Sequence, residues 1–475
     1  MNLFQLLLKQ LRQRALSSSL TVLSIALGVG LAISILVMQR GSENLFAQTD
    51  YGYEVLAGVK GSGLQLTVNT VYRIDKSPGN VKWAVYENLL KNPLFRRNVK
   101  IAIPQCVGDS YNGFPIVGTT PQFFAYDNDG KRIEEAGSRF EYRPGKSFEF
   151  AEGKPFKENR FEAVIGSEVA KKSDLKLGST FHATHGFPVP GQTPDVHAEE
   201  WTVTGVLAPT GTANDKCVYI GLTSFYTIFE HAEAEIARDA IRTGAKPPTP
   251  GVKPKDDHDH AGHDHGEDEV KHYAVAPDGT ILLDKEVVDA REVSAILIKA
   301  RGQDGTSGFS TMNLINNLNL QPDVMAVNPA SVMRDFFGNF VKGPTLLLLA
   351  IAALVILVAA IGVLTTIYNA IASRVHEIAV LRALGATKNR ILVMVAAEAT
   401  VLGLGGAVIG LVFGHGLAAA GSAFMAKTFG EGFNWAHVTE TEIFVLIGTV
   451  VLSCVAGLVP ALKAYRTPVA TNLAG

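Results

Sequence analysis

The sequence predicts a membrane α-helical protein with four transmembrane helices in a 1+3 layout and a large α+β extracytoplasmic domain. Four long apolar blocks, with basic residues beside particular ends, lead to this prediction. A long stretch of short β-prone runs lies between the first and second blocks. Hydrophobic residues make up 47% of the 475 residues and charged residues 19%, which is below the roughly 25% that is typical of soluble domains.

The first block, residues 18–38, contains no charged residue. About 20 helical residues cross a hydrocarbon core of about 30 Å, whereas a cleaved signal peptide has an apolar core of only about 7–15 residues. We therefore expect an uncleaved anchor, preceded by an amphipathic lead-in at residues 1–17. The remaining predicted spans are residues 343–370, 391–420 and 443–462.

Basic residues set the predicted orientation, because cytoplasmic segments carry an excess of Lys and Arg. They lie before the first span, between the second and third, and after the fourth, whereas residues 430–442 carry only acidic charges. This pattern predicts that both termini lie in the cytoplasm. Residues 1–17, 371–390 and 463–475 are then cytoplasmic, and residues 39–342 and the turn 421–442 are extracytoplasmic.

The predicted outer domain, residues 39–342, consists of short β-prone runs broken by Gly, Pro, Asn and Asp. Helical patterns appear at Val81–Leu90 and Gly221–Ala240, so we expect a mixed α+β architecture. The expected strands are Val99–Ile103, Phe114–Val117, Glu162–Ile165, Trp201–Leu207, Gly279–Leu283 and Ser294–Lys299.

A His- and Asp-rich insertion at residues 243–272 interrupts this domain. Its composition offers no apolar surface to bury, which predicts a mobile loop. Imidazole and carboxylate groups bind Zn and other transition metals, so one hypothesis is a metal site of modest affinity. The alternative is a solvated acidic loop. The histidines concerned are His258, His260, His263, His265 and His272.

For two further sets of residues, we favour a structural role over a functional one. His182, His185 and His197 have a spacing that fits no strong metal pattern, so surface or strand-edge histidines are the favoured interpretation. Pairing of Cys106 with Cys217 stays open, and two small buried residues are favoured.

No enzyme motif emerges from the sequence. The only GK[ST] sequence is Gly145-Lys146-Ser147, and Phe140 stands where a phosphate-binding loop needs its first glycine. We therefore expect no intrinsic cofactor and no ATPase activity of the chain itself. The net charge of −2 gives no indication of nucleic-acid binding.

The predicted cytoplasmic segment, residues 371–390, has an apolar stripe at helical spacing that includes Ile371, Val375, Ile378 and Leu381. Gly385 is a natural helix stop. A short amphipathic helix of this kind either docks into a groove of a partner protein or lies flat on the lipid surface.

The third predicted span contains polar and small residues of its own. Glu398 lies within the apolar stretch, and helix packing or snorkelling is favoured over ion transport for it. The small-residue face formed by Gly405, Gly406, Gly410 and Gly414 suits close helix packing or dimerisation.

At residues 374–387 the chain resembles the MacB/FtsX superfamily of ABC-transporter permeases, whose pattern is approximately R-x-x-E-I-G-x-L-R-A-[LI]-G-A-[ST]. Glu398 and Gly405-Gly406 follow in register, and Ala379 stands where glycine is common. The sequences IVGTT at 116–120, AVIGSEVAKKSDLKLGSTF at 163–181 and VPALKAYRTPV at 459–469 also look like this family. The matching residues in the cytoplasmic segment include Arg374, Glu377, Ile378, Leu381, Arg382, Leu384 and Gly385.

The resemblance implies a permease dimer docked through this segment on a separate ATPase subunit, which binds the ATP. It implies mechanotransmission to the outer domain for export or lipoprotein extraction, with a periplasmic adaptor or lipoprotein as further partners. Two alternatives stay open: a metal-handling transporter that uses the His-rich loop and a metal-binding partner, and a regulatory scaffold that moves no cargo.

Overall fold

The computed structural model describes residues 14–46, 51–74, 76–135, 137–188, 191, 195–228, 236–240, 242, 271–302, 307–383, 385–429 and 432–466. The chain divides into two compact units, one containing the long apolar helices and the other containing the sheet. Each unit is described by itself below.

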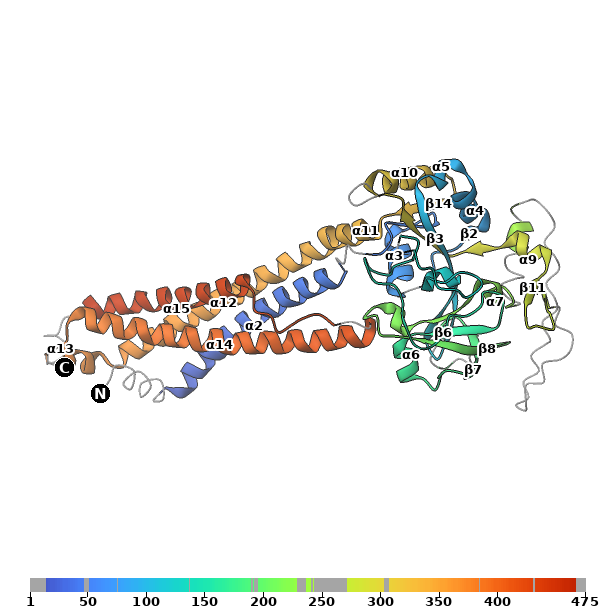
Figure 1. Cartoon of the computed structure of the whole chain (residues 1–475). Coiled ribbons are helices and arrows are strands. Elements are labelled where there is room, and N and C mark those ends of the chain that lie inside the picture. Colours follow the sequence, from blue (N-terminus) through green and yellow to red (C-terminus); the bar gives the residue numbers. More distant parts are fainter. Residues whose placement is uncertain are drawn as a thin grey trace. The chain divides into compact units, whose positions relative to one another are not determined.

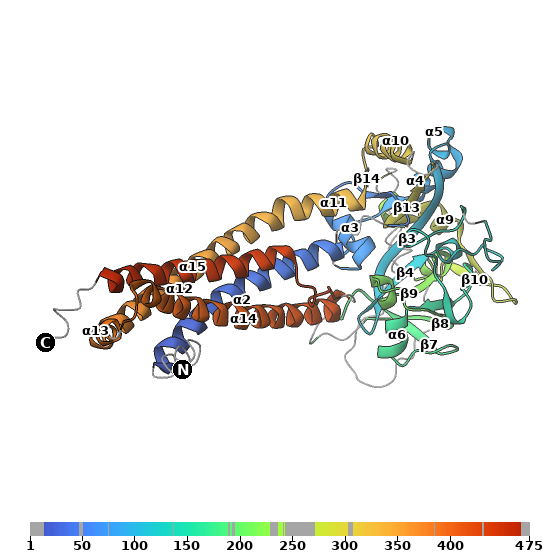
Figure 2. The same ribbon diagram turned by 60° about the vertical axis from the view of Figure 1, so that its left-hand side comes forward.

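The helical unit contains α2 (Ala15–Phe46), α12 (Lys342–Ala372), α14 (Lys388–Phe429) and α15 (Glu440–Arg466). Among the described residues, four helical stretches are long and apolar enough to cross a membrane. Three of them lie within α2, α14 and α15, and the fourth, Pro329–Ala372, includes the whole of α12. The views agree that these helices run side by side (Figures 1 and 2). The four-helix prediction is confirmed, and each helix extends several residues beyond its predicted span.

The interior of this unit is made of small and branched apolar side chains from all four long helices. The buried cluster includes Ile25, Val29 and Ile33 of α2, Val363 and Ile367 of α12, Val395 and Ala399 of α14, and Ala461 of α15. Large apolar side chains such as Leu347, Leu354 and Phe444 are exposed on the outside. Such an outward apolar surface is typical of helices that face lipid.

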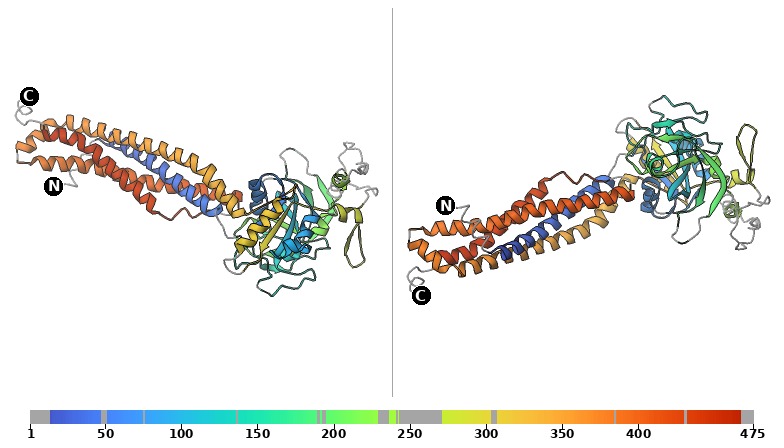
Figure 3. Two further views of the ribbon diagram at one scale, coloured as in Figure 1. Left: turned by 90° about the horizontal axis from the view of Figure 1, so that it is seen from above. Right: turned by 90° about the horizontal axis from the view of Figure 1, so that it is seen from below.

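The sheet unit has a ten-stranded mixed sheet, seen from above and below in Figure 3, with the order β14-β1-β13-β3-β4-β9-β6-β8-β5. β7 lies off this path and pairs with both β3 and β8, which closes β3, β4, β9, β6, β8 and β7 into a ring. The strands are β1 (Val55–Val59), β3 (Val99–Tyr111), β4 (Phe114–Thr119), β5 (Phe150–Gly153), β6 (Glu162–Ile165), β7 (Thr180–His185), β8 (Val196–Leu207), β9 (Val218–Gly221), β13 (Ala295–Ala300) and β14 (Val324–Val327).

Each face of the sheet carries its own apolar core, because successive side chains of a strand point to opposite faces. One core takes Ile116, Ile220 and Trp201 and has members from all six strands of the ring, so it fills the ring. The other takes Val117 and Tyr219 with the aromatic residues Phe123, Phe124, Phe140 and Phe148. The α+β prediction is confirmed.

Short helices and two small strand pairs complete the sheet unit. β2 (Val81–Lys82) pairs with β12 (Glu292–Val293), and β10 (Tyr273–Val275) pairs with β11 (Ile281–Leu283). The helices are α3 (Gly63–Tyr72), α4 (Trp83–Lys91), α5 (Pro93–Arg96), α6 (Ser167–Lys172), α7 (Leu222–Phe225), α9 (Lys285–Ala290), α10 (Ser307–Asn319) and α11 (Pro329–Phe336).

The two helical predictions in this unit need correction. The pattern at Val81–Leu90 begins with two strand residues, so the helix starts only at Trp83. Within the helix predicted at Gly221–Ala240, α7 ends at Phe225 and helix is present again at residues 236–240, and residues 229–235 lie outside the described residues. Thr227 Oγ1 donates to the carbonyl oxygen of Ser224, and such side-chain bonds to nearby backbone compete with helix continuation.

Cys106 and Cys217 are both buried free thiols. Cys106 belongs to the core that fills the ring and Cys217 to the core on the opposite face of the sheet. The disulfide alternative is therefore wrong for this structure, and burial raises the pKa of the Cys217 thiol. A buried thiol of raised pKa is a poor nucleophile, so Cys217 acts as a small core residue.

Candidate functional site

The predicted cytoplasmic segment, residues 371–390, contains one short helix, α13 (Val375–Ala383), between α12 and α14. Gly385 follows with a φ of +97°, a conformation that glycine adopts without strain. The helix therefore ends just before Gly385. Leu384 lies outside the described residues, and for Glu377 and Leu381 the structure describes the backbone of α13 only.

Two residues of the apolar stripe of this segment, Ile371 and Ile378, are buried inside the helical unit. Ile378 is 8% exposed and joins a cluster with Ile371 of α12 and Ile391 of α14. On the outward side, His376 and Val380 are exposed, and Arg374 and Arg382 are half-buried. The buried Ile378 anchors α13 in the core of the helical unit, and His376 and Val380 lie on the exposed surface of this helix.

The glycines predicted for packing divide into two groups. A Cβ added at Gly410 would lie 2.7 Å from the Cβ of Val29 in α2, and one at Gly406 would lie 2.6 Å from the Cβ of Ile25. A Cβ at Gly414 would lie 2.8 Å from the carbonyl oxygen of Gly30. These three glycines, spaced four residues apart, let α14 approach α2 closely within one chain.

Gly405 does not belong to this contact. A Cβ at this position would meet nothing within 4 Å. One residue corresponds to about 100° around a helix, so Gly405 points away from the face shared by Gly406 and Gly410. Gly405 therefore takes no part in the α14–α2 contact, and its predicted role in dimerisation stays a prediction.

Glu398 is 9% exposed in α14. The cations that act on it electrostatically are Arg374 and Arg14. A carboxylate in an apolar helix needs such partners. Glu398 therefore lies within reach of the positive charge near the α12–α13 junction.

A second polar contact inside the helical unit escaped the sequence analysis. His415 of α14 lies with Nε2 2.8 Å from Glu442 Oε2 of α15, and with Nδ1 2.6 Å from the carbonyl oxygen of Trp435. Glu442 is 1% exposed and also accepts a hydrogen bond of 2.7 Å from Thr439 Oγ1. A histidine within an apolar span was the available signal, since such residues are rare unless paired.

Most of the predicted metal loop lies outside the described residues, namely His258, His260, His263 and His265. His272 is described. Its Nδ1 lies 3.9 Å from Asp284 Oδ2, and its carbonyl oxygen accepts a hydrogen bond from the Asp284 amide.

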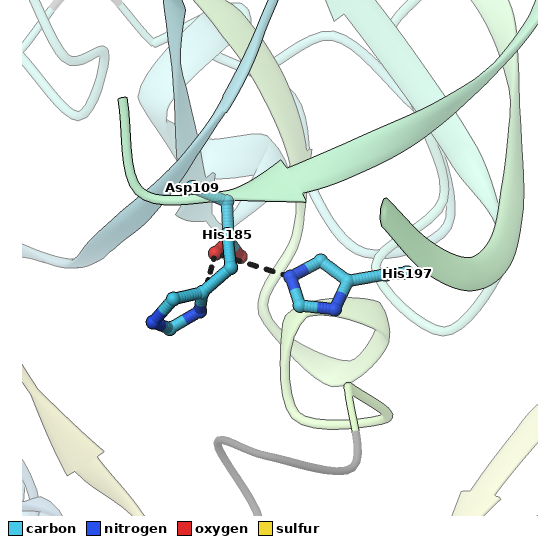
Figure 4. Close-up of side chains that lie close together, drawn as sticks. All are labelled: Asp109, His185 and His197. Atoms are coloured by element: carbon cyan, nitrogen blue, oxygen red, sulfur yellow. Dashed lines mark hydrogen bonds and ion pairs between the residues drawn. The ribbon is translucent and has the colours of Figure 1, made fainter. Parts of the chain in front are cut away.

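The sheet unit contains a different group of potential metal ligands, formed by Asp109, His185 and His197 (Figure 4). His197 Nε2 lies 3.4 Å and His185 Nδ1 lies 3.6 Å from the same oxygen, Oδ1 of Asp109. Each residue offers one ligand atom, and the three atoms lie within 4.8 Å of one another. Asp109 and His197 are buried, whereas the His185 side chain is 52% exposed.

Strand register explains this convergence. β3 and β7 pair with Asp109 opposite His185, and directly opposite residues have Cβ atoms about 4.5–5.5 Å apart. The β3–β4 pairing shifts register between Val107 and Ser110, and such a bulge changes which side chains face the core. Tyr111 then packs on the same core as Cys106, and Asp109 shares that face.

The prediction of surface or strand-edge histidines holds for His182 and His185, which are exposed on β7, and is corrected for His197, which is buried. His182 is exposed, and its Nδ1 lies 3.0 Å from the carbonyl oxygen of Glu199. His185 and His197 instead meet Asp109, which lies far earlier in the sequence. The missing ligand was invisible to a search for local spacing, because only the β3–β7 pairing brings it near.

The Gly145-Lys146-Ser147 sequence lies between Phe140 and β5, and no helix begins there in the described residues. A phosphate-binding loop needs a helix at this point, so the exclusion drawn from the sequence agrees with the structure.

Two parts of the chain match known protein families. Residues 18–249 match the MacB-like periplasmic core domain, and residues 349–469 match the FtsX-like permease C-terminal domain. Together these matches cover most of the chain, including α2, strands β1 to β9 and the C-terminal helices.

Curated relatives agree with these matches. The macrolide export ATP-binding/permease protein MacB of Acinetobacter baylyi is 28% identical over 37% of this chain and 26% of its own length. The ABC transporter permease YtrF of Bacillus subtilis is 29% identical over 30% of this chain and 34% of its own length. The uncharacterized ABC transporter permease YknZ of Bacillus subtilis is 28% identical over 34% of this chain and 39% of its own length.

The chain thus spans about a quarter to two fifths of the length of these relatives. Its four membrane helices and sheet unit agree with the architecture expected for a membrane protein with an extracellular domain. The chain belongs to the MacB/FtsX-type permeases of ABC transporters.

Proposed function

We propose that this permease couples ATP hydrolysis by a separate ABC ATPase subunit to movement of its extracellular domain. The chain itself then binds no ATP and catalyses no reaction. The movement serves export or extraction of a substrate such as a lipoprotein, with two permeases working as a dimer. The single observation that carries the proposal is the way α13 is fixed into the helical unit.

The buried position of Ile378 supports this coupling role. Ile378 packs with Ile371 of α12 and Ile391 of α14, so a force applied to α13 reaches two membrane helices at once. Close-packed apolar contacts transmit small displacements because they are not compressible. A helix lying loosely on lipid would lack this connection.

The outward side of the same segment supports docking to a partner. His376 and Val380 are exposed on α13, and Lys388 and Arg390 are exposed at the start of α14. A mixed basic and apolar surface next to a helix end suits a groove on another protein.

The proposed location is the bacterial inner membrane, with α13 and both termini in the cytoplasm and the sheet unit in the periplasm. The described basic residues Arg14, Arg374, Arg382 and Lys388 support this orientation, because positive charge accumulates on the cytoplasmic side. Glu440 and Glu442 stand at the start of α15, at the opposite end of the hairpin with α14.

Exchanging the charges of α13 tests the proposal. We expect the double variant E377R/R382E, co-expressed with the ABC ATPase encoded nearest to its gene, to bind that ATPase at least about tenfold more weakly, a loss of about 1.4 kcal/mol. ATPase stimulation by the permease in nanodiscs should fall in parallel. The matched control is Lys427→Glu, a charge reversal in the last turn of α14, which should leave both measurements unchanged. Normal association of the double variant would contradict the proposal.

A second candidate function, a metal-handling or metal-responsive permease, is favoured by the Asp109–His185–His197 group in the sheet unit. The His-rich insertion, with Zn as the proposed ion, belongs to the same hypothesis.

A further inference from the structure

We propose that Asp109, His185 and His197 form a binding site for one divalent transition-metal ion at the end of the strand ring. Zn(II) is the ion that we expect to bind there. The site is separate from the His-rich insertion and does not depend on the coupling role of α13. It lies where β3, β7 and β8 meet (Figure 4).

The donor set fits such an ion. Two imidazole nitrogens and one carboxylate oxygen are ligands that Zn(II) takes in proteins, with solvent or substrate in the fourth position of an open site. The same nitrogen-rich set disfavours Mg²⁺ and Ca²⁺, which prefer oxygen ligands alone. The chemistry of these residues therefore selects a transition metal.

The distances fit as well. Zn–N and Zn–O bonds of about 2.0–2.2 Å at a tetrahedral centre place neighbouring ligand atoms roughly 3.3–3.6 Å apart. The His197 Nε2 to Asp109 Oδ1 distance is 3.4 Å, and the His185 Nδ1 to Asp109 Oδ1 distance is 3.6 Å. N–H···O hydrogen bonds are typically shorter, at about 2.7–3.2 Å. Two of the three ligand edges therefore already have the spacing of a metal site.

The third edge joins the two imidazoles, whose rings stand nearly perpendicular with centroids 5.9 Å apart. Closing this edge requires a rotation of one ring. His185 is the exposed member at the end of β7, whereas His197 is buried. We expect His185 to complete the coordination shell when the ion enters.

Burial of Asp109 and His197 makes the site rigid, and exposure of His185 makes it accessible from solvent. The side chain of Asp109 has no exposed surface and that of His197 is 6% exposed, and both lie in strands held by register on each side. A buried carboxylate is costly unless positive charge compensates it, and a divalent ion supplies that charge. The exposed position of His185 leaves one coordination position open to solvent, so the bound ion is exchangeable.

The competing explanation is a purely hydrogen-bonded trio in which a shared proton takes the place of the ion. Both explanations need the same residues to be close. They differ in stoichiometric metal uptake, which only the first predicts, and the experiment is built on that difference.

The experiment uses the full-length chain in detergent or nanodiscs, in a background in which His258, His260, His263 and His265 are replaced by Asn. This background removes four of the five histidines of the insertion as an independent source of metal binding and keeps His272, whose side chain is 15% exposed. Zn(II) uptake is measured by isothermal titration, and Co(II) uptake by the visible absorption of the bound ion. We expect one equivalent of metal, with Co(II) bands typical of a four-coordinate nitrogen and oxygen site.

Three variants in this background decide the assignment. His185→Ala and Asp109→Asn should each weaken Zn(II) binding by at least about 100-fold, since even the loss of residues that merely support metal ligands costs 10–100-fold. His182→Ala, an exposed histidine on the same strand, should bind like the background. Because His185 is exposed, its loss leaves the fold intact, which circular dichroism verifies.

Two results would overturn the inference. The first is a background protein that takes up no Zn(II) or Co(II) at micromolar concentration. The second is an equal loss of binding in the His182 and His185 variants, which would indicate adventitious binding to surface histidines.

Discussion

The helical unit and the sheet unit hold their elements together in different ways. In the sheet unit, large side chains fill the space between backbones, and Trp201, Tyr219 and Phe124 are fully buried. In the helical unit, the closest approach has almost no side chain in it, because Gly406, Gly410 and Gly414 face α2. Apolar side chains gain little free energy when they move from lipid into a helix interface, because both surroundings are apolar. Close backbone packing therefore takes the place of the hydrophobic effect there.

Two carboxylates, Glu442, which is buried, and Glu158, which is half-buried, show a parallel contrast. Glu442 in the helical unit is paired with His415 and Thr439 within hydrogen-bond distance. Glu158 in the sheet unit has a raised pKa because burial outweighs the attraction of Arg291. One carboxylate is stabilised by its surroundings and the other is not, so removing the charge should have opposite effects in the two units.

The largest expected effect tests the glycine contact. Gly410→Leu should destabilise the helical unit by about 3 kcal/mol or more, because overpacking a tight contact usually costs about 1–3 kcal/mol and Gly410 has no room even for a Cβ. Gly405→Leu, on the same helix but facing open space, should be neutral or slightly stabilising, since leucine favours helix more than glycine does. Thermal unfolding in nanodiscs measures both. Equal stability of the two variants would show that α14 and α2 do not meet at this face.

The next effect concerns the paired carboxylate. Glu442→Gln keeps the shape of the side chain but replaces charge-assisted hydrogen bonds with neutral ones, which should cost about 1.5–3 kcal/mol. Glu440→Gln is the matched control, because Glu440 is exposed in the same first turn of α15. We expect the Tm in nanodiscs to fall for the first variant only. An unchanged Tm would mean that the His415–Glu442 contact adds nothing to stability.

The difference between the units also explains what the sequence predicts. Length and the absence of charge identify a membrane helix without knowledge of its neighbours, so all four helices were predictable. Which glycine faces which helix was only partly predictable. Gly405 and Gly406 are adjacent in sequence, yet only Gly406 contacts α2. Composition does not show which residues of a helix face a neighbouring helix.

The sheet unit was predictable at the level of short strands, such as Glu162–Ile165, which matches β6 residue for residue. The pairing of strands was not, because partners such as β3 and β7 are far apart in sequence. The candidate metal site depends on that pairing. Two of its three residues stood out as histidines, but Asp109 became a candidate only when the β3 bulge placed it beside them.

The smallest expected effect concerns Glu158 and has the opposite sign. Because partial burial raises the pKa of Glu158 above its ordinary value of 4.5 in the folded protein, the native state binds more protons than the unfolded state between the two pKa values. Stability from this group is therefore present at low pH and lost as pH rises through that interval. At pH 7 the buried charge is a net penalty, and Glu158→Gln should raise the Tm of the sheet unit by at most about 2–4 °C.

Acidification separates this explanation from a simple packing effect. Well below pH 4.5, the ordinary pKa of a glutamate, Glu158 is protonated in both states, so the advantage of the Gln variant should disappear there. Glu152→Gln on β5, an exposed glutamate, should show no gain at either pH. A gain that persists at pH 3 would mean that the amide fits better than the carboxyl for reasons other than charge. The two units would then no longer differ in how they accommodate a buried carboxylate.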